Sequence, residues 1–236
     1  MTPATPHTSD FPWVAPMLRA TIQRDLRRQL SGFWVCGSLP SGGAVLAANH
    51  GSWWDGYLML HLGWEFGHPA HIMMNAPELA RFPFLQRIGC RPPSAGRELA
   101  RAAQAGSWVM IFPEGALQPP TQPGGERLAP LHSGAAWIAR SASAPGRPVP
   151  LVPVALRVHL RADRTPAAFA RFGPPCPPDS LEPALNHELR QLDADLQAAD
   201  LYQPPEGYLA LWRGRGAQQQ ETPASHLLTR LTGDQL

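Results

Sequence analysis

The 236-residue sequence contains no lysine, and all 20 of its basic side chains are arginines. A guanidinium stays protonated and is not a compact ammonium. Schiff-base chemistry, a phosphate-loop lysine and a lysine general base are therefore excluded. The missing lysines, together with 28 prolines, match the codon bias of a GC-rich genome. The formal net charge of +2 at pH 7 gives the chain no overall electrostatic preference for nucleic acid.

Cysteine is also scarce, and its spacing suits neither disulfides nor zinc. No CxxC pair occurs, and the cysteines are odd in number and far apart: Cys36, Cys90 and Cys176. A disulfide framework is not expected, and a reducing cytoplasm is the favoured location. The other candidate metal ligands do not share one helical face, because a Gly-His-Pro turn interrupts them: His61, His68 and His71. We therefore expect no metal site.

Long hydrophobic runs are missing as well. No stretch of about 18 apolar residues occurs, so no transmembrane helix is expected, and the N-terminus lacks the basic and apolar regions of a signal peptide. The Pro/Thr-rich residues 1–14 predict a flexible N-terminus, and residues 213–236 predict a polar C-terminal tail. Residues 15–212 are long enough to form one domain with its own core.

Within that domain, short apolar runs alternate with helical patterns. Apolar runs bounded by turn residues predict strands at 33–36, 44–48, 71–74, 107–112, 151–156 and 168–172. Apolar residues at helical spacing predict helices at 54–66, 77–87, 97–105, 131–142 and 180–199. This alternation predicts an α/β fold, with a mixed, largely parallel central sheet flanked by helices in a single domain.

Residues 15–31 are expected to form an amphipathic helix ahead of the first strand. Its apolar stripe consists of Met17, Leu18, Ile22, Leu26 and Leu30. Four arginines lie mostly off that stripe: Arg19, Arg24, Arg27 and Arg28. The pattern is typical of a helix lying on a membrane surface, and equally of a helix that packs on a sheet with its arginines in water.

The most informative segment is residues 47–56. An apolar strand leads into an Asn49-His50-Gly51 turn, and the helix that follows places Asp55 about one turn from its start. Asn49 is suited to holding the turn, and Gly51 gives it backbone freedom. A separation of five residues allows the Asp55 carboxylate to reach the imidazole of His50, which orients a general base and stabilises its protonated form. A purely structural His–Asp pair is the alternative.

Two further strands carry candidate residues at their ends. Residues 109–112 end abruptly at Pro113-Glu114-Gly115, and ligands of open α/β sheets bind beyond the carboxyl ends of strands. Glu114 is therefore a candidate site residue, with a solvated loop glutamate as the alternative. The apolar run 151–156 begins next to proline and contains Pro153, which predicts an edge strand or a bulge.

Taken in order, these segments resemble the motifs of the glycerol-phosphate acyltransferase superfamily: His50-xxxx-Asp55, then residues 112–115, then residues 152–155. Their order and approximate spacing are similar to those of bacterial lysophosphatidate (1-acyl-glycerol-3-phosphate) acyltransferases. Residues 40–43, 131–136 and 172–175 resemble further features of that family, so the likeness covers roughly residues 20–180. It implies that family's fold, and the transfer of a fatty acyl group from acyl-CoA or acyl carrier protein to a lipid hydroxyl.

The resemblance also implies roles for individual residues. His50 would be the general base and Asp55 its orienting partner, with backbone amides after His50 as oxyanion donors. The resemblance also implies direct transfer without an acyl-enzyme, and the absence of a GxSxG nucleophile elbow from the sequence fits this. The residues implied in substrate binding are Asn49, Glu114, Gly115, Arg91, Arg97 and Pro153. The expected partners are the acyl thioester, a lipid acceptor and a membrane surface under helix 15–31, with no cofactor and no nucleic acid. The protein would then lie at the inner face of the membrane.

The sequence departs from the family pattern after Gly115. Ala116, Leu117 and Gln118 stand where the family has Thr, Arg and Ser, which commonly help to bind the phosphate of the acceptor. A glycerol-3-phosphate acceptor is therefore in doubt, and another lipid alcohol is the alternative acceptor. Arg91 or Arg97 is the candidate for gripping a phosphate, with a surface arginine as the alternative. A catalytically altered lipid-binding protein and an acyl-thioester hydrolase are the competing functions.

Aromatic residues gather next to His50. Their two interpretations are the lining of an acyl or membrane-facing channel and ordinary core packing. The residues are Trp53, Trp54, Tyr57 and Trp64.

Overall fold

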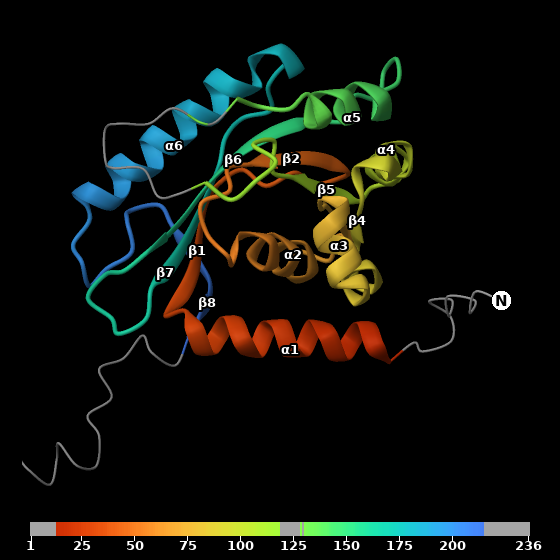
Figure 1. Ribbon diagram of the computed structural model, residues 1–236. Helices are drawn as coiled ribbons and strands as arrows, with labels where there is room; N and C mark the ends of the chain where they lie inside the picture. Colours follow the sequence, from red (N-terminus) through yellow and green to blue (C-terminus); the bar gives the residue numbers. More distant parts are fainter. Residues whose placement is uncertain (1–12, 119–127, 129, 215–236) are drawn as a thin grey trace, which may run out of the picture.

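The structure, a computed structural model, describes residues 13–118, 128 and 130–214 (Figure 1). These residues form one eight-stranded sheet in the order β4-β3-β5-β2-β6-β7-β1-β8. The strands are β1 (Gly32–Gly37), β2 (Ala44–Ala48), β3 (Ala70–Met73), β4 (Cys90–Arg91), β5 (Trp108–Ile111), β6 (Leu151–His159), β7 (Ala167–Phe172) and β8 (Leu209–Arg213). Neighbouring strands are parallel except for β6 with β7 and β1 with β8. The predicted mixed, largely parallel α/β sheet is confirmed.

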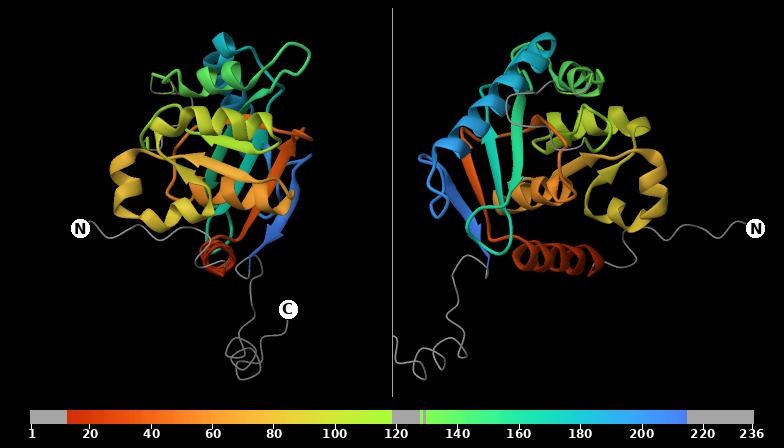
Figure 2. Two further views of the ribbon diagram at one scale, coloured as in Figure 1. Left: turned by 90° about the vertical axis from the view of Figure 1, so that its right-hand side faces the viewer. Right: turned by 60° about the vertical axis from the view of Figure 1, so that its left-hand side comes forward.

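Helices cover both faces of this sheet (Figure 2). On one face lie α1 (Val14–Gln29), α2 (Asp55–Glu65) and α3 (Ala76–Arg81), and on the other lie α4 (Gly96–Gln104), α5 (Gly134–Ala142) and α6 (Leu181–Ala198). Three 3₁₀ turns join them: η2 (Pro83–Ile88), η3 (Pro93–Ala95) and η4 (Pro178–Ser180). Side chains of β2 alternate between the two cores, with Leu46 packed among the first group and Val45 among the second.

Several boundaries differ from the sequence expectation. The predicted helix 77–87 is two elements, because Pro83 supplies no amide for an α-helical bond: α3 ends at Arg81 and η2 begins at Pro83. The strands β4 and β8 were not predicted. Strand β8 ends at Arg213, the first residue of the predicted polar tail. Most of that tail, 215–236, and most of the predicted flexible N-terminus, 1–12, lie outside the described residues.

The prediction that residues 151–156 form an edge strand or a bulge was wrong. Strand β6 lies inside the sheet, between β2 and β7. Pro153 pairs with Ala47 of β2 on one side. On the other side it falls where β7 ends, and its carbonyl accepts a hydrogen bond from the Gly173 amide at 3.0 Å. The sheet tolerates this proline because the amide that it lacks would point toward the end of β7, where ladder pairing stops.

The packing interpretation of helix α1 is the one that the structure supports. Its apolar stripe is turned toward α2 and η2, where Leu18, Ile22 and Leu26 join the core, and only Met17 of the stripe is exposed. Two of its arginines lie over aromatic rings of neighbouring elements, Arg19 over Trp64 and Arg27 over Trp212. The stripe is therefore covered by protein and is not a bilayer-facing surface. No helix in the described part of the chain is both long and apolar enough to cross a membrane.

A buried histidine lies under α1. His61 of α2 is fully buried, its Nδ1 is 3.4 Å from the side-chain amide nitrogen of Gln23, and its ring contacts Trp212 edge-on. The Glu65 carboxylate is 3.6 Å from His61 Nε2, which is too far for a hydrogen bond. Burial, reinforced by the positive charge of Arg27, lowers the pKa of His61 from 6.5 to about 4. His61 is therefore neutral at pH 7.

This burial predicts a loss of stability in acid. Between pH 6.5 and about 4, His61 is protonated in the unfolded chain but not in the folded chain. The free energy of unfolding therefore keeps its full value above this pH range and falls by about 3 kcal/mol as the pH decreases through it. Urea unfolding of His61→Leu should show a correspondingly weaker pH dependence than wild type, whereas the exposed control His187→Leu should not. Equal pH dependence in wild type and His61→Leu would contradict the assignment.

Candidate active site

The turn after β2 brings His50 and Asp55 together as predicted. Asp55 is the first residue of α2, and its buried carboxylate points back into the turn. Its Oδ2 accepts hydrogen bonds from His50 Nδ1 at 3.0 Å and from the amides of Gly51 and Ser52, each at 2.8 Å. The Ser52 hydroxyl donates to the other oxygen, Oδ1. The carboxylate therefore both closes the turn and orients the imidazole.

This arrangement fixes what His50 can do chemically. The proton on Nδ1 is assigned from the neighbouring carboxylate, and it leaves the lone pair of Nε2 free. The His50 side chain is about one quarter exposed, at 24%, whereas that of Asp55 is 2% exposed. The ring also lines a large cavity. His50 thus presents an oriented base to a cavity. The Gly51 and Ser52 amides, expected as oxyanion donors, are instead bonded to Asp55.

The loop after β5 holds His50 from the other side. The Phe112 ring stacks on the imidazole, with the ring centroids 4.3 Å apart. The amide of His50 donates to Glu114 Oε2 at 2.7 Å, and the carbonyl of His50 accepts from the amide of Gln118 at 2.8 Å. Both backbone polar groups of His50 are therefore bound by this loop. Glu114 is buried and positions the base, a role that the sequence did not predict.

Gly115 shapes the same loop. Its φ of +74° lies in the left-handed region, which favours glycine. A Cβ at this position would lie 2.8 Å from the ring of His132, whose amide donates to the Pro113 carbonyl at 2.7 Å. Gly115 and His132 both line the cavity with His50. The sequence missed His132 as a site residue, because its contact with the loop depends on tertiary packing.

Asn49 and Pro153 lie in the framework of the site. The amide group of Asn49 donates to the Leu156 carbonyl at 3.1 Å and accepts from the Leu156 amide at 2.7 Å, which ties the turn after β2 to β6. Asn49 is buried, and neither it nor Pro153 lines the cavity. The structure gives Asn49 the turn-holding role, and it places Pro153 in the sheet below the site.

The cavity has a volume of about 1230 Å³ and lies beyond the carboxyl ends of β2, β3 and β5, where ligands of open α/β sheets bind. Much of its wall is apolar, including Leu60, Ile72, Phe82, Leu85 and Ile138. Burial raises the pKa of Tyr57 in this wall and raises the pKa of the Cys90 thiol to about 12, against the opposing effect of Arg91. Cys90 is therefore protonated at pH 7 and is not a nucleophile.

The two candidate arginines occupy different places. Arg91 Nε donates to Glu98 Oε1 at 2.7 Å, and its Nη1 donates to the carbonyls of Gln86 and Cys90 at 2.8 and 2.9 Å. Arg91 does not line the cavity. Arg97 does, and it is exposed. Arg81, at the end of α3, also lines the cavity, and the sequence did not single it out. Of the two candidates, Arg97 is the one available to a ligand.

The histidines and the aromatic residues that lie close together in the sequence do not form clusters in the structure. His68 stacks on Trp108, whereas His61 packs on Trp212, and no group of three metal-ligating side chains occurs among the described residues. Of the aromatic cluster, Trp53 and Tyr57 line the cavity. The other two belong to the contact with α1: Trp54, which donates to Gln29, and Trp64, which lies under Arg19.

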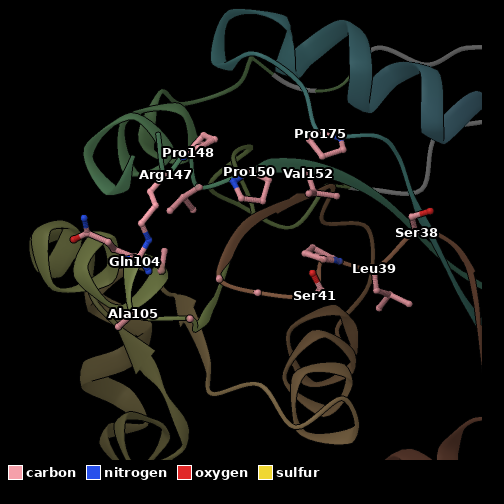
Figure 3. A pocket seen from close by; sticks show the side chains of 16 residues that line it. Ser38, Leu39, Ser41, Gln104, Ala105, Arg147, Pro148, Pro150, Val152 and Pro175 are labelled. Atoms are coloured by element: carbon pink, nitrogen blue, oxygen red, sulfur yellow. The ribbon is translucent and has the colours of Figure 1, made fainter. Parts of the chain in front are cut away.

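A second cavity of about 590 Å³ lies at the opposite ends of the strands, near the residues that precede β2, β5 and β6 (Figure 3). Its one charged side chain is Arg147, which extends from the loop before β6 toward Gln104. Ser38 and Ser41 contribute hydroxyl groups. The lining of this cavity includes no histidine and no carboxylate, whereas His50 lines the other cavity.

Comparison with known proteins shows the family to which the chain belongs. The family model described as Acyltransferase matches residues 18–157, more than half of the chain, and the matched segment includes His50, Asp55 and Glu114. The chain belongs to the acyltransferase family. Membership of this family makes the protein an acyltransferase enzyme, as the resemblance to the glycerol-phosphate acyltransferase superfamily implied.

The fold of this acyltransferase is similar to that of the 1-acyl-sn-glycerophosphate (LPA) acyltransferase PlsC from Thermotoga maritima. The TM-score is 0.55 at 17% sequence identity, and the match covers 83% of this chain and 85% of that chain. At this identity the likeness shows a shared fold. A comparison with curated proteins gives no significant match.

Proposed function

We propose that this acyltransferase moves a fatty acyl group from a thioester, acyl-CoA or acyl carrier protein, to the hydroxyl of a lipid acceptor. The observation that carries the proposal is the His50–Asp55 pair facing a large apolar cavity. A largely apolar cavity with a few polar groups suits a long acyl chain whose reacting carbonyl lies beside His50.

The reaction that fits these residues is direct transfer. The acceptor hydroxyl donates its proton to His50 Nε2 as its oxygen attacks the thioester carbonyl, and Asp55 stabilises the resulting imidazolium. Collapse of the tetrahedral adduct breaks the carbon–sulfur bond, and the thiolate takes the proton back from His50. An acyl-enzyme is not needed. The Ser52 hydroxyl is bonded to Asp55 and the Cys90 thiol is protonated, so neither is an activated nucleophile.

For the acceptor, the proposal is a lysophospholipid such as 1-acylglycerol-3-phosphate, or a related lipid alcohol. The structural match to an LPA acyltransferase and the exposed Arg97 in the cavity support a phosphate-bearing acceptor. Ala116 and Leu117 line the same cavity and carry no charge, which supports an uncharged alcohol. Because either acceptor is a lipid, we propose that the enzyme works at the inner face of the cytoplasmic membrane as a peripheral protein.

The deciding experiment supplies the purified chain with an acyl-CoA labelled in its acyl group, with and without a lysophospholipid or total lipid extract. Thiol release and labelled lipid are measured together. We expect thiol release that depends on the acceptor and equals the labelled lipid formed. Release that is independent of any acceptor indicates a thioester hydrolase. Lipid binding without release indicates a binding protein. Either result contradicts the proposed transfer.

A further inference from the structure

The mouth of the His50 cavity carries exposed apolar side chains from three separate elements. Trp53, from the turn before α2, is 65% exposed, Leu117, from the loop after β5, is 52% exposed, and Trp137, from α5, is 45% exposed. All three line the cavity and face solvent at the same time. These three residues, which line the cavity where it meets solvent, are together called the rim.

Arginines adjoin the rim. A Cβ at Gly96 would lie 3.1 Å from the Trp137 ring, so Trp137 covers the start of α4, next to Arg97. Arg97 and Arg81 are exposed and line the same cavity, and the acidic residue among the lining is Glu78. The exposed lining of the cavity thus combines large apolar side chains with a net positive charge.

We propose that the rim docks on an anionic lipid bilayer, so that the cavity opens directly onto the membrane surface. This inference rests on the proposed function, since it names the surface through which a lipid acceptor would reach His50. Tryptophan favours the interface between water and acyl chains, where the ring is buried and the N–H stays wet. Arginines beside it pair with lipid phosphates.

Two observations favour a bilayer at the rim over other arrangements. The apolar stripe of α1, the obvious alternative membrane contact, is already packed on α2 and η2. The rim is also continuous with the apolar wall of the cavity, so an acyl chain passing from a docked bilayer to the cavity would not cross water. An acidic carrier protein could pair with the arginines, but its charged surface would offer no apolar partner to the three side chains of the rim.

The test is sedimentation of the full chain with vesicles of equal parts phosphatidylcholine and phosphatidylglycerol. Leu117→Ser/Trp137→Ser should reduce the bound-to-free ratio about tenfold or more, because both side chains lose their burial in the bilayer. The matched control is Leu160→Ser/Leu209→Ser, which removes two leucines that are even more exposed but do not line the cavity, and it should bind like wild type. Leu117→Ser alone, in an exposed loop, replaces the double variant if that one fails to fold.

A second experiment tests the contribution of the arginines by comparing vesicles with and without anionic lipid. Arg81→Gln/Arg97→Gln should weaken binding to the mixed vesicles, and the loss should be absent on pure phosphatidylcholine. Met17→Ser/Arg24→Gln/Arg28→Gln should leave binding unchanged, because it alters only the exposed side of α1. No vesicle binding by wild type, or equal binding by rim and control variants, would falsify the proposal. Loss of vesicle binding in the α1 variant alone would also overturn it. So would rim variants that bind vesicles like wild type but bind acyl carrier protein more weakly.

Vesicle binding requires no turnover, so its outcome stands whether or not acyl transfer is confirmed. Conversely, wild-type activity on a detergent-dispersed acceptor tests the proposed function in the absence of a bilayer. The two proposals can therefore fail independently.

Discussion

Replacing His50 with alanine is expected to lower the acyl-transfer rate by about a thousandfold while the protein stays folded. A positioned general base contributes roughly 10²–10⁴ to a rate, and in this fold no second base is oriented by a carboxylate at the cavity among the described residues. The side chain is partly exposed, so its loss should have little effect on folding. The measurement is labelled lipid formed per minute with saturating acyl-CoA, alongside a thermal melt.

The matched control for this prediction is His187→Ala, which removes an exposed histidine from α6 and should keep wild-type activity. A second variant, His50→Gln, keeps a planar polar group beside Phe112 but supplies no base. It should be nearly as slow as His50→Ala. Full activity in a folded His50→Ala protein would place the base elsewhere and remove the observation on which the proposed function rests.

The contact between His50 and Asp55 could be predicted from the sequence because it is local. His50 and Asp55 are separated by one turn and the start of one helix, so their spacing alone brings the two side chains together. The supports of the pair are not local. Glu114 reaches the His50 amide from 64 residues away, and Asn49 binds Leu156 from 107 residues away. The family resemblance implied substrate binding for both, and the sequence also suggested that Asn49 holds the turn, but it could not show which distant residue each side chain would bond.

The arginines illustrate the same limit. From the sequence, both Arg91 and Arg97 were candidates for binding an anion. In the structure Arg91 is paired with Glu98, whereas Arg97 lines the cavity. On α1, periodicity identified the two faces correctly. It could not show that α2 and η2 cover the apolar one, since that depends on how distant elements pack. The two strands that were missed lie at the edges of the sheet, where a short or exposed run carries little apolar signal.

Replacing Asp55 with asparagine should slow acyl transfer by roughly a hundredfold. An asparagine oxygen at the place of Oδ2 can still accept from the Gly51 and Ser52 amides, and its NH₂ group can donate to the Ser52 hydroxyl. The turn and the imidazole orientation are then preserved, and what is lost is the negative charge that stabilises protonated His50. The measurement is the rate of labelled lipid formation with saturating acyl-CoA, alongside a thermal melt that checks the fold.

A purely structural role for Asp55 predicts a different outcome. If Asp55 only closed the turn, Asp55→Asn would keep the rate of wild type. Ser52→Ala is the matched control, because it removes the hydroxyl bond to Oδ1 and leaves the carboxylate charge in place. It should cost less than about tenfold in rate. A loss in Ser52→Ala equal to that in Asp55→Asn would mean that the geometry of the turn limits the reaction, and that the charge does not.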